Sequence, residues 1–340
     1  MKLRLLAAAM LLTSEAAAQE PSLRPVDKTA YAFARDSGFA MPVNNSRIAF
    51  TIPEKDLLAE NVAFDPRDSS FYVGSTRHGK IMRRTKNGRV TDFIPTGRDG
   101  MWMVVGMKVD PPRSALWVNS SAQGNYVRLR AEEQGQAGLF RYDISGRLVK
   151  KYVPREPGNH FFNDLVIAPD GTVYITDMIG GSIYRVGAGD SLELFIGPGK
   201  LRSPNGITAD MDGTQLFVAS SDGIAFVDVA RRTVEMMTPS AGVDPIGVDG
   251  IYWHKGALIG IQGGRRNRVQ RFVIDIPGRR LTSAEVLEQN HPMFMNPTTG
   301  VIVGEDLYYI ANSQFSSFRR GELFPMSRLF ETVVLRLPVN

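Results

Sequence analysis

The chain has 340 residues, of which 43% are hydrophobic and 22% charged, and its formal net charge at pH 7 is +5. This composition supports a buried core and excludes an intrinsically disordered chain. The absence of cysteine excludes disulfide scaffolds, thiol catalysis and cysteine-ligated zinc or iron–sulfur centres. The positive excess is too small to indicate a nucleic-acid partner, and we expect none.

The first eighteen residues have the layout of a secretory signal peptide. Lys2 and Arg4 form a basic start, residues 5–12 are apolar, and Ala16 to Ala18 form a small-residue end. The apolar stretch is much shorter than the roughly 20 residues that cross a bilayer, and no later stretch is longer. We therefore expect cleavage near Ala18, export to the periplasm or the medium, and no membrane span.

A sequence unit recurs six times, at intervals of 42 to 58 residues. Most copies start at a polar residue, often followed by glycine, and five of the six lead through a turn into a strand that contains an aromatic residue, whereas the fifth leads into Ala257 to Ile259. The copies start at Glu60, Val105, Asn163, Asn205, Asp249 and Thr299. Hairpin signals such as Asn87-Gly88 separate further strand-like runs between the copies. Four antiparallel strands per unit match a propeller blade, so the sequence predicts an all-β, six-bladed β-propeller.

The last unit is one strand short. After residue 331 it offers only a third strand, whereas Arg47 to Ile52 alternates like a strand, with Ile48, Phe50 and Ile52 on one face. We expect this N-terminal strand to complete the last blade, which closes the ring without a free sheet edge. The predicted organisation is a signal peptide (1–18), an N-terminal extension (19–45) and one propeller (46–340).

Four of the six starting residues carry side-chain oxygen atoms suited to a metal ion. The first strand of each propeller blade lines the central channel, so Glu60, Asn163, Asn205 and Asp249 are expected to converge there. Carboxylate and amide oxygens suit a hard cation such as calcium, and two carboxylates balance a divalent charge. Any one of the four alone would be read as a turn residue. Four at equivalent positions favour a shared metal site.

These motifs resemble a known family. Four segments carry the resemblance: Glu60-Asn61-Val62, Asn163-Asp164, Pro204-Asn205-Gly206 and Asp249-Gly250. They look like the senescence-marker-protein/gluconolactonase family of six-bladed propellers, over essentially the whole chain from about Ser46. The resemblance implies that the Glu, the two Asn and the Asp bind a divalent metal, commonly Ca²⁺ and in some cases another ion. It also implies the opening of lactones or the cleavage of esters or organophosphates.

One departure from related propellers limits the mechanism. Paraoxonase-like relatives carry two histidines near the metal, and the corresponding positions in this chain are Val105 and Ser120. We therefore expect a mechanism in which the metal polarises the substrate carbonyl and Asp249 acts as general base or nucleophile. His160, just before Asn163, is a candidate for proton transfer, and the alternative is a surface histidine.

Two further residues are expected to support the metal ligands from behind. Asp164 follows a predicted ligand directly, and Thr299 occupies the sixth equivalent position. The alternative for Asp164 is an exposed turn residue.

The segments predicted on the same mouth of the channel contain large apolar residues. From them we expect a substrate pocket formed by Trp102, Met103, Phe162 and Phe294. Two long loops, 119–137 and 312–330, are expected to cover the entrance. Such a pocket favours an apolar lactone or ester over a small polyol lactone. The alternative function is a non-catalytic propeller that binds a ligand or a protein and holds calcium as a structural ion. The sequence leaves the substrate and the oligomeric state open.

Overall fold

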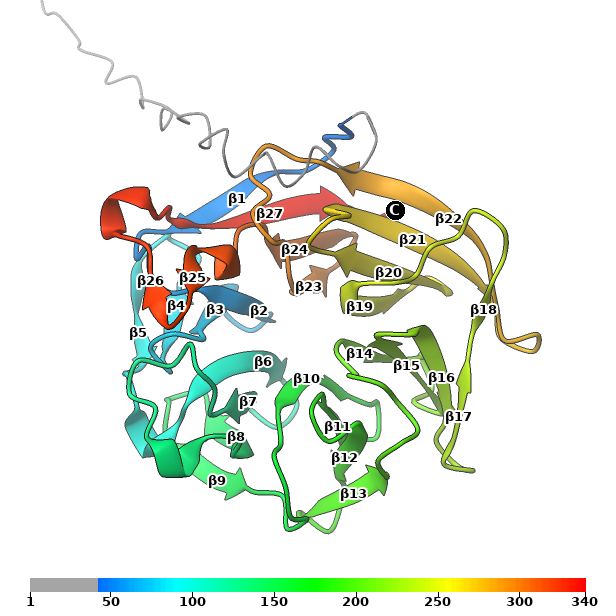
Figure 1. Ribbon diagram of the computed structural model, residues 1–340, viewed down its shortest axis with the longest axis horizontal. Coiled ribbons are helices and arrows are strands. Elements are labelled where there is room, and N and C mark those ends of the chain that lie inside the picture. The colour runs from blue at the N-terminus through cyan, green and yellow to red at the C-terminus, as the bar shows by residue number, and fades with distance from the viewer. Residues whose placement is uncertain (1–41) are drawn as a thin grey trace, which may run out of the picture. The chain divides into compact units, whose positions relative to one another are not determined.

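The computed structural model describes residues 42–340, so the predicted signal peptide and most of the predicted extension lie outside the described residues. The described part forms six antiparallel sheets of four main strands each, which follow one another round a ring in chain order (Figure 1). The six innermost strands contact one another in a closed cycle. The predicted six-bladed propeller is therefore confirmed.

The first three blades are built from consecutive strands, which follow one another from the axis outward. Blade 1 contains β2 (Ala59–Asp65), β3 (Ser70–Ser75), β4 (Ile81–Arg84) and β5 (Val90–Ile94). Blade 2 contains β6 (Met103–Asp110), β7 (Ala115–Ser121), β8 (Ala137–Asp143) and β9 (Leu148–Tyr152). Blade 3 contains β10 (Phe162–Ile167), β11 (Val173–Asp177), β12 (Ser182–Val186) and β13 (Leu192–Ile196).

The last three blades repeat the plan with two additions. Blade 4 contains β14 (Ile207–Ala209), β15 (Gln215–Ser220), β16 (Gly223–Asp228) and β17 (Thr233–Met236). Blade 5 contains β19 (Val248–His254), β20 (Ala257–Gln262), β21 (Arg268–Asp275) and β22 (Arg280–Gln289), with β18 (Thr238–Pro239) parallel to β22 at its outer edge. Blade 6 contains β23 (Gly300–Val303), β24 (Asp306–Ile310), β27 (Thr332–Pro338) and β1 (Arg47–Ile52).

Short elements occupy the connections. They are the 3-10 helices η1 (Arg98–Gly100), η2 (Ala131–Glu133), η3 (Phe315–Ser317) and η4 (Met326–Arg328), and the small hairpin β25 (Phe318–Arg319) and β26 (Glu322–Leu323). None of the helical turns within residues 42–340 is long and apolar enough to cross a membrane.

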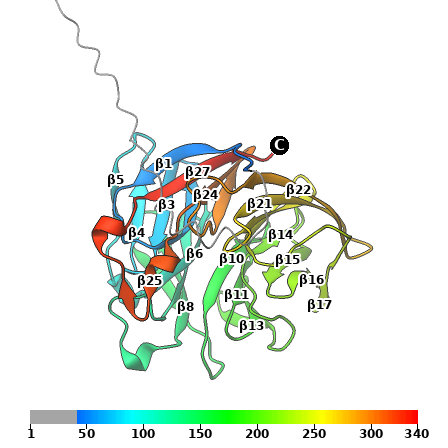
Figure 2. The ribbon, with the colours of Figure 1, turned by 45° about the horizontal axis from the view of Figure 1, so that its top comes forward.

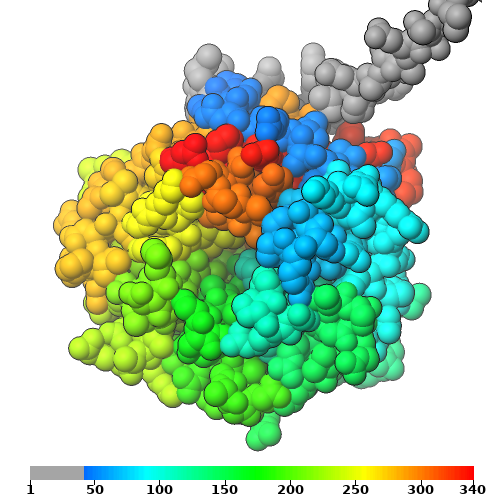
Figure 3. Space-filling model, turned by 180° about the vertical axis from the view of Figure 1, so that it is seen from behind, coloured from blue at the N-terminus to red at the C-terminus, as the bar shows by residue number. Residues whose placement is uncertain are grey.

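The hydrophobic core lies between neighbouring blades. Because side chains alternate between the two faces of a strand, each sheet offers apolar residues to the blade on either side. Between blades 1 and 2, for example, Tyr72 and Ile81 pack in one cluster with Leu116, Val118 and Phe140. Five similar clusters fill the other junctions. Figure 3 shows the face opposite to that of Figure 1, where the blades again meet round the centre.

The ring closes through β1 and β27, which run side by side in Figure 2. Their pairing places Ile52 opposite Thr332 and Arg47 opposite Arg336, as the predicted outer strand requires. One detail of the prediction is wrong. The register shifts between Ile48 and Phe50, so Ile48 is turned outward and is 38% exposed, whereas Phe50 and Ile52 are buried.

The innermost strands are irregular where the repeats start. The pairing register breaks between Ala59 and Val62 in β2, and equivalent breaks occur in β6, β10 and β19. An extra residue at a bulge re-aims the side chains beside it. The bulges therefore turn the starting residues of these repeats away from the ordinary alternation and toward the channel.

Candidate metal site and substrate pocket

The four predicted metal ligands share one pocket. Glu60, Asn163, Asn205 and Asp249 all line a cavity of about 360 Å³. The remaining lining residues are Met103, Gln123, Asn125, Phe161, Met178, Ile179 and Phe315. Blades 1, 3, 4 and 5 each supply one of the four oxygen-bearing side chains, so the expected convergence occurs.

Hydrogen bonds to backbone carbonyl groups of the ligand residues join neighbouring blades and hold these residues in place. The amide of Gly206 donates to the carbonyl of Asp249 at 3.0 Å, which fastens blade 4 to blade 5 beside both ligands. The Thr176 hydroxyl donates to the carbonyl of Asn205 at 2.6 Å. A side chain at Gly206 is impossible without rearrangement, because its Cβ would lie 2.2 Å from the Asp249 carbonyl oxygen. Glycine after the ligand therefore permits the close approach of the two strands.

Without a cation, the pKa values of both pocket carboxylates are raised above their ordinary range. Burial and the charge of Asp164 raise the pKa of Asp249 to about 7, against the lowering effect of a hydrogen bond from Asn205. Burial, followed by the charges of Asp249 and Asp164, raises the pKa of Glu60 well above its ordinary value. Among the ion pairs of the described residues, none involves Glu60 or Asp249. A cation between them would remove this repulsion.

The donor atoms also fit a hard cation. The Oδ1 atoms of Asn205 and Asp249 are buried and have no hydrogen-bond partner within the described structure. Leaving such groups unpaired is costly, so their convergence in one cavity indicates a ligand between them. Calcium takes six to eight oxygen ligands. Four protein residues would leave positions open toward the pocket for water or a substrate oxygen.

One side of the pocket is apolar. Met103 from β6, Phe161 before β10, Met178 and Ile179 after β11, and Phe315 from η3 form what we call the apolar wall. Of these five residues, only Met103 was predicted for the pocket. Gln123 and Asn125, from the connection between β7 and β8, add amide groups to the lining.

Three predicted pocket residues lie elsewhere. Phe162, the first residue of β10, is fully buried between blades and packs 5.2 Å from the ring of Tyr184, whereas Phe161, just before the strand, lines the pocket. Phe294 packs against Tyr309 at 6.0 Å. Trp102 is buried in the apolar cluster next to the pocket, and its ring lies 4.4 Å from the Lys151 ammonium.

His160 does not line the pocket, and both of its ring nitrogens are occupied. Nδ1 lies 2.6 Å from Oδ2 of Asp177, and Nε2 lies 2.9 Å from the carbonyl oxygen of Glu156. Burial lowers the pKa of His160, but the hydrogen bonds to Asp177 and Glu156 outweigh it and raise the pKa overall. The structure therefore places His160 in a buried ion pair rather than at a reacting atom.

The two residues expected behind the ligands are both buried. Asp164 is 1% exposed, so it is not a surface turn residue, and its Oδ2 accepts the amide of Ile207 at 3.4 Å. Thr299 donates its hydroxyl to the carbonyl of Glu60 at 2.7 Å and accepts the Asn61 side-chain amide at 2.8 Å. Val105, at the equivalent place in blade 2, is buried in the apolar cluster and offers no ligand atom.

The two long connections supply pocket residues, as their length indicates. Residues 122–136, which include η2, carry Gln123 and Asn125, and residues 311–331 carry Phe315. Gln314 anchors the second connection. Its side chain donates to the carbonyl of Phe330 at 2.8 Å and accepts the Phe330 amide at 2.8 Å. This clamp fixes the backbone beside Phe315 at the pocket.

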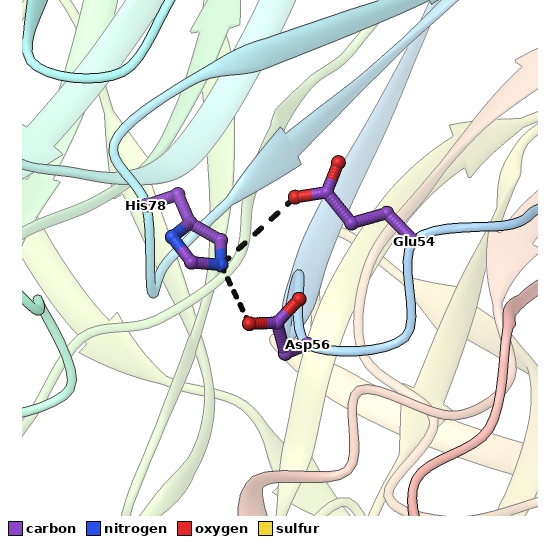
Figure 4. A group of neighbouring side chains, drawn as sticks. All are labelled: Glu54, Asp56 and His78. Carbon is purple, nitrogen blue, oxygen red and sulfur yellow. Dashed lines mark hydrogen bonds and ion pairs between the residues drawn. The ribbon is translucent and has the colours of Figure 1, made fainter. Parts of the chain in front are cut away.

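A second group of potential ligand atoms lies outside the pocket. Figure 4 shows His78 facing Asp56, 2.9 Å away, and Glu54, 3.9 Å away. Both carboxylates already have basic partners, since Lys80 lies 2.5 Å from Glu54 and Arg77 lies 3.9 Å from Asp56. Each carboxylate of the group therefore has a cationic neighbour, although Lys80 also pairs with Asp92 at 3.2 Å.

Fold and site together define a six-bladed propeller with a polar, acidic pocket on its axis. The sequence matches no known protein-family profile and no curated protein sequence. Several solved structures nevertheless share the fold, and all are distant in sequence.

A gluconolactonase from Xanthomonas campestris is 15% identical, with a TM-score of 0.58 over 89% of this chain and 98% of that one. A luciferin-regenerating enzyme is 14% identical, with a TM-score of 0.60 over 88% and 95%. An inactive variant of virginiamycin B lyase from Staphylococcus aureus, solved with quinupristin, is 14% identical, with a TM-score of 0.58 over 85% and 83%. The likeness shows a shared fold, which occurs in a gluconolactonase, in a luciferin-regenerating enzyme and in a lyase.

Proposed function

We propose that the protein is a divalent-metal-dependent hydrolase that opens lactones or cleaves esters. The observation that carries the proposal is the convergence of two carboxylates without a cationic partner, Glu60 and Asp249, with two amide side chains at one cavity. An apolar wall beside this polar group provides a place for the rest of a substrate. Neither the cluster of carboxylates and amides nor the apolar wall is needed to form the propeller fold.

Glu60, Asn163, Asn205 and Asp249 would hold the ion, for which we propose Ca²⁺. When bound there, a divalent cation supplies a Lewis acid that polarises the substrate carbonyl and stabilises the negative charge that develops on its oxygen. The donor set of carboxylates and amides suits calcium or another hard cation better than a thiophilic one.

Asp249 is the residue that we propose as general base. Its carboxylate removes a proton from a water molecule as the water oxygen attacks the substrate carbonyl carbon, and the proton stays on Asp249 until the alkoxide leaving group takes it. Without a cation, burial and the charge of Asp164 raise its pKa to about 7, and a bound cation would lower it, so that the carboxylate would be ionised at neutral pH in the loaded site. Asn205 donates a hydrogen bond to this carboxylate and so orients it.

The substrate is proposed to be apolar on one side. Met103, Phe161 and Phe315 offer a surface for an acyl or aryl group, whereas Gln123 and Asn125 offer hydrogen bonds to a polar part. A cavity of about 360 Å³ is within the usual size range for small-molecule sites. A lactone or ester with one bulky apolar substituent fits this division.

The basic, apolar and small-residue layout of residues 1–18 supports export, which we propose as well. Expression with the natural N-terminus, followed by N-terminal sequencing of the periplasmic and secreted fractions, tests it. A mature chain that starts near Gln19 would support export, and an uncleaved cytosolic chain would contradict it.

One observation favours a non-catalytic alternative. Among the described residues that line the pocket, Glu60 and Asp249 are the only ionisable ones, and both are assigned to the cation. This lining therefore offers no second acid to protonate a poor leaving group. In this alternative the calcium is structural and the pocket only binds a ligand.

Hydrolysis by the purified protein distinguishes the two functions. A panel of lactones and aryl esters is assayed with the wild type, with Asp249→Asn and with Asp212→Asn, an exposed aspartate between β14 and β15 that serves as control. The hydrolase proposal predicts turnover that Asp249→Asn lowers at least about 100-fold and Asp212→Asn leaves unchanged. Calcium binding without turnover of any panel member would favour the alternative.

A further inference from the structure

We infer that Lys108 shifts the charge preference of the cation site toward divalent ions, because its ammonium repels a trivalent ion more strongly than a divalent one. Lys108 does not itself reach the pocket, and its role is electrostatic. The inference rests on the proposed cation site and adds a residue that none of the repeat motifs marked.

Lys108 carries a buried ammonium group in the central channel. It lies on β6 in blade 2, and its Nζ is 3.6 Å from Oδ1 of Asp164 on β10. Both atoms are buried and have no hydrogen-bond partner within the described structure. A buried ammonium without hydrogen bonds is costly, so its retention opposite a buried carboxylate calls for an electrostatic reason.

The opposite side of the channel fixes the position of this ammonium. The ring of Tyr252 lies with its centroid 5.6 Å from the Lys108 Nζ. Tyr252 belongs to blade 5, which stands across the axis from blade 2, and its hydroxyl oxygen accepts the amide of Gly300. Lys108 therefore spans the channel between a carboxylate and an aromatic face, a favourable setting for a cation.

Three carboxylates lie in this part of the channel, those of Glu60, Asp164 and Asp249. Asp164 directly follows the proposed ligand Asn163, and its Oδ2 accepts the amide of Ile207, two residues after the proposed ligand Asn205. Among the ion pairs of residues 42–340, Lys108 supplies the only basic partner of any of the three. With all three carboxylates ionised and Lys108 protonated, the cluster carries a net charge of −2. A divalent cation brings it to neutrality.

The charge balance predicts how variants bind ions of different charge. Lys108→Met leaves a charge of −3 and removes a repulsion that acts more strongly on a trivalent ion than on calcium. The electrostatic energy between the lost ammonium and a bound ion is proportional to the charge of the ion. If the substitution raises calcium affinity about 10-fold, it should therefore raise the affinity for a trivalent ion about 30-fold.

The test measures binding of Ca²⁺ and of Tb³⁺, a trivalent ion of similar size and ligand preference, by calorimetry at one pH and ionic strength. The variants are Lys108→Met, Asp164→Asn and the double substitution, with net cluster charges of −3, −1 and −2. The Tb³⁺-to-Ca²⁺ affinity ratio should be highest for Lys108→Met, lowest for Asp164→Asn, and close to wild type for the double variant. Lys108→Arg, which keeps the charge, should match the wild type.

The outcomes separate this inference from the proposed site. Ratios that follow the charge order support the role of Lys108. Calcium binding by the wild type with equal ratios in all variants overturns that role and leaves the site intact. Absence of any cation binding by the wild type overturns the site itself. If Lys108→Met does not fold, Asp164→Asn and the double variant still differ by this one substitution, and the same increase in ratio is required between them.

Discussion

The imidazole of His160 and the carboxylate of Asp177 form a buried ion pair, with Nδ1 2.6 Å from Oδ2. The other carboxylate oxygen accepts the backbone amides of Phe161 at 2.8 Å and of Gly180 at 3.0 Å. Asp177 thereby ties together the two backbone segments that carry Phe161, Met178 and Ile179 of the apolar wall. A residue expected to transfer protons instead helps to hold the pocket in shape.

This ion pair predicts a pH-dependent contribution to stability. The folded-state pKa of His160 is raised above its ordinary value of 6.5, so the contribution is complete below about pH 6.5 and is lost as pH rises through the folded-state value. His160→Gln should lower the free energy of unfolding by about 1.5–3 kcal/mol at pH 5.5 and by less at pH 9. Urea unfolding of both proteins across this range measures it. Parallel pH profiles would show that the pair does not stabilise the fold through its charge.

Calcium binding should compete with protons at Asp249. Its pKa of about 7 in the cation-free protein is raised, so the protonated form predominates below pH 7 and must lose its proton when the ion binds. We expect calcium affinity to fall by about tenfold per pH unit below pH 7 for the proton on Asp249, and more steeply where Glu60 is protonated as well. Calorimetry in buffers of different ionisation enthalpy should show proton release that decreases as pH rises through 7. Affinity that is constant between pH 5.5 and 8.5 would exclude Asp249 as a ligand.

The contact between blades 4 and 5 predicts a strong effect at Gly206. A Cβ there would lie 2.2 Å from the carbonyl oxygen of Asp249 and 2.9 Å from the amide of Ile251. Gly206→Ala should therefore destabilise the protein by about 1–3 kcal/mol and weaken calcium binding, because the strand that carries Asp249 must move. Gly197→Ala is the matched control, since its Cβ would meet nothing within 4 Å. Equal thermal stability and calcium affinity of the two variants would contradict the close approach.

Phe315 should decide how well bulky apolar substrates bind. It lines the pocket from the connection that Gln314 anchors, whereas Met326 of the same connection is 52% exposed. Phe315→Ala should raise KM for aryl or long-acyl esters about 3–10-fold with little change in kcat, because it removes apolar contact in the ground and transition states alike. Met326→Ala should leave both constants unchanged. An effect on small lactones equal to that on bulky esters would argue against an apolar subsite at Phe315.

The architecture was predictable because its signals repeat. Six copies of one pattern, five of them ending in an aromatic-containing strand, fix the blade number, and the unpaired strand before residue 60 accounts for the closure by β1. The prediction for Ile48 was wrong because a register shift leaves no mark in the alternation of apolar residues. The convergence of the four oxygen-bearing residues followed from the same repeat, since equivalent positions of the innermost strands meet at the axis.

The apolar lining of the pocket was less predictable than the four oxygen-bearing residues. Phe161 and Phe162 are adjacent and chemically identical, so only the phase of β10 decides which ring faces the cavity. Met178 and Phe315 reach the pocket from connections whose paths depend on tertiary contacts. No sequence motif marks Lys108, because its partner Asp164 lies on another blade and is distant in sequence. A basic residue in an inner strand, where burial is expected, was the one available signal.

The proposed hydrolase depends most directly on one comparison, ester or lactone turnover by the same protein sample before chelation, after chelation and after calcium is returned. Our account predicts that turnover is lost with the ion and restored by calcium in the wild type, and that Glu60→Gln and Asp249→Asn stay inactive throughout. Turnover that survives complete removal of divalent ions, with wild-type rates in Asp249→Asn, would contradict the account.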